Sequence, residues 1–94
     1  MNKAEREYIG RAVALGCMLC RHLGLGETPA EYHHQRTGIG AGRRASHLDG
    51  TPLCPAHHRS SNEALHVMGR RAWERHYGIS EVELIKRTKE LCGL

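Results

Sequence analysis

The sequence is poor in bulky aromatic residues. Its 94 residues include no phenylalanine, one tryptophan and three tyrosines, and hydrophobic residues make up 39% of the chain. Typical globular domains contain about 45–50%, and a chain of this length buries only about 60–70% of its extended surface. The sequence therefore predicts a single domain whose thin core needs a covalent or metal cross-link.

Long hydrophobic runs are also missing. The longest uncharged apolar stretch, Ala12–Cys20, has nine residues, whereas a membrane-spanning helix needs about 20. The first ten residues are charged and have no apolar core of the kind found in signal peptides. These features predict a cytoplasmic protein, in which the four cysteines serve a purpose other than disulfide formation.

Acidic residues are few and scattered, with a single aspartate, Asp49, and no cluster of Asp and Glu. Sites that hold two magnesium ions need several carboxylates, so the sequence argues against a site of that kind. Histidine, by contrast, accounts for 8 of the 94 residues. Arginine outnumbers lysine by 11 to 3, and its guanidinium is suited to forked phosphate contacts.

The positive charge is concentrated in the middle of the chain. Residues 1–32 and 76–94 are each neutral overall, whereas residues 33–75 hold seven arginines against three acidic residues, a net charge of +4. The same segment contains six of the eight histidines. A basic, histidine-rich centre indicates that the protein binds a polyanion and a metal ion.

The apolar pattern and the turn residues predict an α+β domain. A helix is expected over residues 3–15, and Gly16 ends it. Short extended pieces are expected over 30–35 and 51–54, with a flexible glycine-rich turn at 37–44 between them.

Two capping boxes predict the helices of the last third of the chain. Ser60-x-x-Glu63 predicts a helix that begins near Ser61 and ends at Gly78. Ser80-x-x-Glu83 predicts a final helix that runs through about Cys92. The side chains expected to face inward from that helix are Leu84, Ile85 and Leu91.

Two residue pairs have the spacing of a structural zinc site, namely Cys17-x-x-Cys20 and Cys54-x-x-His57. A two-residue gap lets both side chains of a pair reach one ion from a tight turn. Together the pairs predict a closed, four-ligand site for Zn²⁺. The remaining cysteine, Cys92, is expected to be a buried, inert thiol on the last helix.

The order of four segments resembles that of HNH (His-Me finger) endonucleases. The segments are CMLC, AEYHH, the glycine-rich loop and DGTPLCPAHH, and they cover residues 17–58. In that family a ββα-metal motif of two strands and a helix holds one catalytic metal ion, and a structural zinc often braces its base. The resemblance implies a zinc-braced finger over 17–58, flanked by an N-terminal helix in 1–16 and C-terminal helices in 59–94.

The resemblance also implies roles for individual residues. His33 and His58 would bind the catalytic metal, and His34 would be the general base. Asp49 occupies a position that the family fills with asparagine, and it would orient His34 or accept a backbone N–H. The ion would be Mg²⁺, Mn²⁺, Ni²⁺ or Zn²⁺, and imidazole ligands suit the last three better than Mg²⁺.

A narrower likeness extends to ALHVMGRRAWERHYG in the last third of the chain. With the earlier segments, it is similar to the phage recombination-enhancement nucleases, which cut DNA with a RecA filament as partner. This likeness implies a phage or prophage protein in a bacterial host and makes His66 a third metal ligand. On an unbroken helix His66 would lie about 12 Å from His58 in rise, so a chain break is needed; Asn62 is the alternative ligand if the helix is continuous.

We therefore expect a metal-dependent DNA endonuclease or nickase in which His34 takes a proton from water. Two alternatives remain open: a non-catalytic zinc module that binds nucleic acid, and a zinc-stabilised adaptor for protein partners. A binding module has no use for a second histidine cluster. Arginines 43, 44 and 59 are candidates for phosphate contacts, and none is assigned individually.

Overall fold

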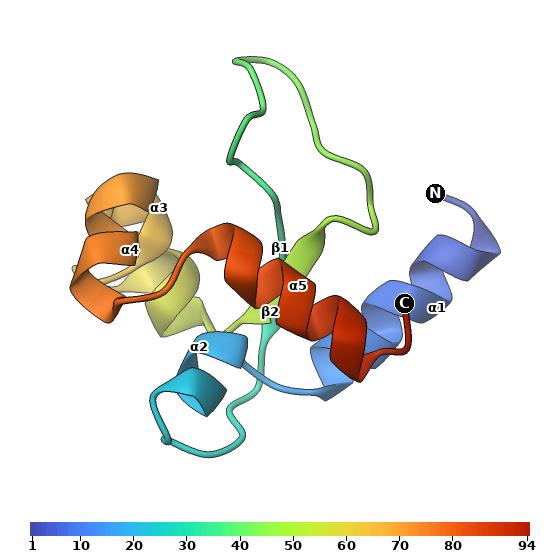
Figure 1. Ribbon diagram of the computed structural model, residues 1–94, viewed down its shortest axis with the longest axis horizontal. Helices are drawn as coiled ribbons and strands as arrows, with labels where there is room; N and C mark the ends of the chain where they lie inside the picture. Colours follow the sequence, from blue (N-terminus) through green and yellow to red (C-terminus); the bar gives the residue numbers. More distant parts are fainter.

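The computed structural model describes residues 1–94 and confirms the predicted α+β class, with two strands, five α-helices and one π-helical turn, η1 (Figure 1). In chain order the elements are α1 (Lys3–Ala14), α2 (Met18–His22), β1 (Glu31–His34), β2 (Gly50–Leu53), η1 (Ala56–Ser60), α3 (Leu65–Met68), α4 (Arg70–Tyr77) and α5 (Glu81–Leu91). The two strands lie at the centre, and the helices surround them (Figure 1). None of the helices combines the length and the apolar character needed to cross a membrane.

The strands pair antiparallel, with Glu31 opposite Leu53 and His34 opposite Gly50. Gly50 cannot be replaced without a shift, because an added Cβ would lie 2.5 Å from the carbonyl oxygen of His33 and from the ring of Tyr32. The glycine thus allows the Tyr32 ring to cross the neighbouring strand. Its hydroxyl then donates a hydrogen bond of 2.9 Å to the carbonyl of His47, which ties β1 to the chain that leads into β2.

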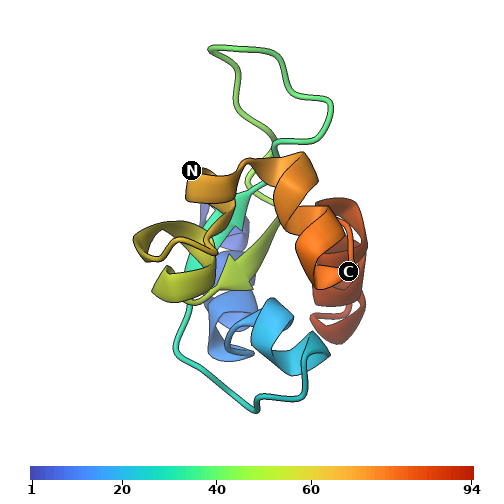
Figure 2. The same ribbon diagram turned by 90° about the vertical axis from the view of Figure 1, so that its left-hand side faces the viewer.

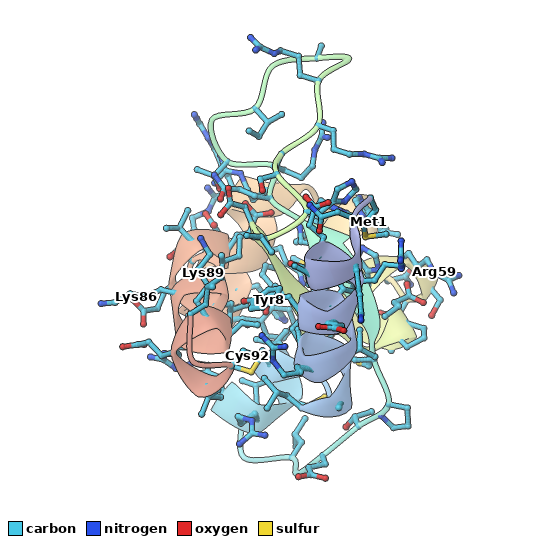
Figure 3. The ribbon with its side chains drawn as sticks, turned by 90° about the vertical axis from the view of Figure 1, so that its right-hand side faces the viewer. Met1, Tyr8, Arg59, Lys86, Lys89 and Cys92 are labelled. Atoms are coloured by element: carbon cyan, nitrogen blue, oxygen red, sulfur yellow. The ribbon has the colours of Figure 1, made fainter.

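Helices α1 and α5 enclose the sheet. Helix α5 contacts β2, and α1 contacts both strands; Figure 3 shows Tyr8 of α1 between these two helices. Every residue of β2 is buried, so this strand forms the centre of the domain. The main core contains three of the cysteines, Cys17, Cys20 and Cys54, with Met18, Leu19, Leu53, Leu65, Trp73, Ile79 and Leu84.

The helix predicted from Ser61 to Gly78 is wrong in its first half. The Ser61 hydroxyl donates to the carbonyl of Ala56 and so closes η1 instead of opening a new helix. The chain then turns, α3 begins at Leu65, and Gly69 with φ +86° separates α3 from α4. The same hydroxyl accepts from the backbone N–H of Glu63 at 3.2 Å, but this contact lies in the turn before α3, and Ser60 of the predicted capping box is the last residue of η1.

The two terminal helices follow their predictions more closely. Helix α1 is confirmed to within one residue of its predicted end, and α5 is capped by Ser80, whose hydroxyl accepts from the backbone N–H of Glu83 at 3.0 Å. Leu91, however, is 52% exposed rather than inward; it is the last residue of α5, beyond Thr88, the last buried residue of the helix. Cys92 is accordingly only half-buried.

Candidate metal centres and active site

The four residues predicted to bind structural zinc meet in the core. Cys17 caps the N-terminus of α2, Cys20 lies within α2, Cys54 follows β2, and His57 lies in η1. Their ligand atoms lie within 4.8 Å of one another. Nδ1 of His57 is 3.3 Å from Sγ of Cys54 and 3.5 Å from Sγ of Cys20. A tetrahedral zinc ion separates such atoms by about 3.5–3.8 Å, so the donor set fits a metal ion such as zinc.

The surroundings of this cluster suit a metal more than free thiols. The three cysteines are buried and form no disulfide. Burial raises the pKa of the Cys17 thiol to about 12, so without a cation the sulfur would be neutral. Burial also lowers the pKa of His57, which favours the neutral ring that binds metals.

Three further histidines converge at a second point. His33 of β1, His58 of η1 and His66 of α3 form a second group of potential metal ligands. Nε2 of His58 lies 3.2 Å from Nδ1 of His33 and 3.0 Å from Nε2 of His66. Imidazole nitrogens on one tetrahedral ion lie about 3.3 Å apart, so these rings also fit a single ion.

The course of the chain between η1 and α3 determines which of the two candidate third ligands, His66 or Asn62, lies beside His58. The turn at 61–64 interrupts the helical path, which brings His66 beside His58 although they are eight residues apart. Asn62 is exposed, and the hydrogen bonds of the three histidines go to one another, Glu81 and Glu31 and not to Asn62. The structure therefore joins His66, and not Asn62, to the cluster.

Two carboxylates lie behind these histidines, and sequence reasoning missed both. Nε2 of His33 lies 2.6 Å from the carboxylate of Glu81, and Nδ1 of His58 lies 2.6 Å from that of Glu31. A carboxylate can only accept, so each ring carries its proton on the outer nitrogen and presents the lone pair of the other nitrogen to the shared point. Such partners fix the tautomer and the orientation of metal-binding histidines.

Glu81 also connects this cluster to the loop that follows β1. Its side chain is fully buried and accepts hydrogen bonds from the backbone N–H groups of Arg36 and Thr37 and from the Thr37 hydroxyl. Burial raises the pKa of Glu81, but the hydrogen bonds from His33 and Thr37 lower it more, to about 2. Glu81 is thus an anion at neutral pH that holds His33 and the start of the loop together.

His34 belongs to neither cluster. Its Nε2 lies 3.1 Å from Nδ1 of His47, and its Nδ1 has no hydrogen-bond partner. Burial, and then the neighbouring His47, lower the pKa of His34 below its ordinary value, so the ring is neutral at pH 7. His34 shares a cavity of about 440 Å³ with His33, His58 and His66.

Asp49 does not contact His34. Its carboxylate pairs with Nζ of Lys89 at 2.5 Å, and its carbonyl accepts from the N–H of Gln35. The expectation that Asp49 orients His34 is therefore wrong, because Lys89 of α5 reaches the carboxylate and His47 occupies the partner position. His47 is a third residue that sequence reasoning missed, since nothing in its spacing distinguishes it from the other histidines.

The sequence matches no protein family, and no curated protein is significantly similar to it. The class of the protein is therefore defined by its fold and site: a small α+β domain with a buried Cys₃His cluster. Beside it, an open cavity contains a second, all-histidine cluster.

Proposed function

We propose that this protein is a metal-dependent DNA endonuclease or nickase of the HNH (His-Me finger) type, and that β1, β2 and η1 form its ββα-metal motif. One observation carries the proposal. Three histidines that fit one metal ion and a fourth, His34, with a free ring nitrogen line the same cavity. Phosphodiester hydrolysis needs this combination of a cation site and a neutral base.

His34 is the residue that removes the proton from the attacking water. In this role the Nε2–H of His34 would donate to Nδ1 of His47, 3.1 Å away, and the lone pair on Nδ1 of His34 would be free to accept the proton. When Nδ1 takes the proton, the bond to His47 persists and holds the charged ring in place. The lowered pKa of His34 keeps the ring in its basic form at neutral pH.

His33, His58 and His66 would hold the catalytic ion. A divalent ion bound there would neutralise charge on the phosphate and on the leaving oxygen. Glu81 and Glu31 keep two of the three rings in the tautomer that can bind it. A neutral, all-imidazole donor set favours Zn²⁺, Ni²⁺ or Mn²⁺ over Mg²⁺.

The Cys₃His cluster has a positioning role in this scheme. His57 belongs to that cluster, and the next residue, His58, belongs to the catalytic one. A zinc ion that fixes Cys54 and His57 would therefore fix η1, and with it the position of His58. The structural site and the active site share one turn of chain.

The partners and the origin rest on the likeness to the phage recombination-enhancement nucleases. That likeness favours DNA as the substrate, a RecA filament as a partner and a phage or prophage gene. A comparison of cleavage with and without a RecA filament on DNA tests this point. Stimulation supports it, and equal rates contradict it.

The test of the function is a plasmid-nicking assay. Protein depleted of loosely bound metal is supplied in turn with Mg²⁺, Mn²⁺, Ni²⁺ and Zn²⁺, and conversion of supercoiled to open-circular plasmid is followed. We expect conversion only with added metal, and equal conversion by His76→Ala, which removes an exposed histidine outside both clusters. Folded, zinc-loaded protein that binds the plasmid but nicks it with none of the four ions would favour the binding-module alternative.

A further inference from the structure

The loop between the strands projects from the body of the protein. Figures 1 and 2 show it as a single extension above the sheet and the helices. Its ends are held together by the hydrogen bond from the N–H of Gln35 to the carbonyl of Asp49. Its outer part is thin, because residues 37–42 include three glycines, two of them with φ +76°.

The charges on this loop are of one sign and have no counterions. Arg36, Arg43 and Arg44 are exposed, and no acidic residue lies between Gln35 and Leu48. None of the three guanidinium groups makes an ion pair. In contrast, three arginines elsewhere on the molecule, Arg59, Arg70 and Arg87, pair with glutamates.

These three arginines line the same cavity as the histidines. Unneutralised cations around a concave site raise the local concentration of anions. An anion in the cavity would therefore meet the three arginines together with the three histidines that fit a metal ion.

Both ends of the loop are bonded to the histidines of the site. At its start, Glu81 accepts from Arg36 and Thr37 and from His33. Near the other end of the loop, Nδ1 of His47 lies 3.1 Å from Nε2 of His34. Arg36, at the anchored start of the loop, is thus held close to His33 through Glu81, and Arg43 and Arg44 lie in the part of the loop that leads back to His47.

We infer that residues 36–44 form an arginine arm that binds the phosphate backbone of double-stranded DNA on either side of the bond in the cavity. This inference rests on the proposed function and names how the same site holds its substrate. The choice of duplex follows from the absence of aromatic residues in the arm, since proteins that hold single strands stack bases on aromatic side chains. Contacts to phosphates alone carry no sequence information, so the arm should bind duplexes of any sequence.

The test compares two double variants that remove the same charge. Arg43→Ala/Arg44→Ala alters the arm, and Arg71→Ala/Arg75→Ala alters exposed, unpaired arginines on α4, outside the cavity. Both are made in a His34→Ala background, so that binding is measured without cleavage. Affinity for a labelled duplex of about 20 base pairs is measured by fluorescence anisotropy between about 50 and 200 mM salt.

We expect the arm variant to bind at least ~10-fold more weakly and to reduce the salt slope by about 2, one unit for each lost phosphate contact. The α4 variant should change affinity less than ~3-fold. Circular dichroism should show both variants folded, because all four side chains are exposed. Equal losses in the two variants, or no loss in the arm variant, would overturn the inference, as would tighter binding of the parent protein to a single strand than to the duplex.

The outcomes separate this inference from the proposed function. If the protein with His34 intact fails to nick plasmid while the arm variant still loses duplex affinity selectively, the arm is supported and the nuclease is not. If nicking occurs and the arm variant binds normally, the nuclease stands and the arm is wrong.

Discussion

Replacing Cys20 with serine tests whether the Cys₃His cluster binds a zinc ion that stabilises the fold. The Cys20 thiol is 4% exposed and lies 3.9 Å from Sγ of Cys54 and 3.5 Å from Nδ1 of His57. Serine cannot supply a thiolate, so the variant retains three of the four ligands. We expect it to lose most of its bound zinc and much of its stability.

The expected loss is large relative to the stability of the whole domain. Structural zinc sites contribute roughly 10–16 kcal/mol of binding free energy in small zinc-dependent domains, whereas a domain of this length has a free energy of unfolding of about 5–14 kcal/mol. A loss of only ~3 kcal/mol lowers the melting temperature of a domain this size by roughly 12–24 °C. We therefore expect Cys20→Ser to melt at least ~12 °C below the unaltered protein or to be unfolded at 25 °C.

The assay combines elemental analysis with thermal unfolding followed by circular dichroism, on protein prepared without added zinc. The matched control is Cys92→Ser, which changes the one cysteine outside the cluster and should retain about one zinc per chain and melt within ~4 °C of the unaltered protein. If the unaltered protein contains no metal and the two variants melt alike, the structural-zinc account is wrong.

Three further predictions concern the proposed catalytic site. The cleavage rate should fall as the pH is lowered, with a midpoint below about 6.5, because burial and His47 lower the pKa of His34 and only the neutral ring accepts a proton. A pH–rate profile with a midpoint above 7 contradicts this. Glu81→Gln should reduce the cleavage rate ~10–100-fold and raise the metal concentration needed for activity. The control Glu83→Gln, two residues later on α5, should change neither the rate nor the metal requirement in a metal titration. His47→Ala should lower kcat about 10-fold with little change in KM, because it frees the His34 ring; steady-state kinetics that show only a KM effect would refute the positioning role.

The residues of the Cys₃His cluster could be predicted because their signal is local. Each pair lies on one tight turn, and the two-residue gap is visible without knowledge of the fold. What brings the pairs together is β2, which carries Cys54 to α2 through the buried residues 51–53. The spacing thus predicted a cluster whose assembly depends on long-range packing.

The carboxylates of the second cluster could not be found in the same way. Glu81 lies 48 residues from His33, and Glu31 lies 27 residues from His58. On the sequence, Glu81 is an ordinary acidic residue in the first turn of a helix, where such residues are common. Only the packing of α5 against the sheet turns it into a partner of the histidine.

Local rules failed where one residue had two possible partners. The Ser60 capping box predicted a helix that begins near Ser61, but Ser60 is the last residue of η1 and the Ser61 hydroxyl donates back to the carbonyl of Ala56. Asp49 had two candidate roles near β1, yet Lys89, 40 residues later, takes its carboxylate. In both cases the winning contact is set by a neighbouring element that the motif does not contain.

The most direct test of the account is the nicking rate of His34→Ala across a metal titration, with His58→Ala beside it. His34 is not a member of the histidine cluster, and its ring pairs with His47. Its loss should therefore leave folding, zinc content and DNA affinity unchanged and reduce cleavage at least ~100-fold at every metal concentration. His58→Ala should also be inactive at low metal, but excess metal should restore part of its activity, because two of the three imidazoles remain. A His34→Ala protein that nicks plasmid at the unaltered rate would contradict the account.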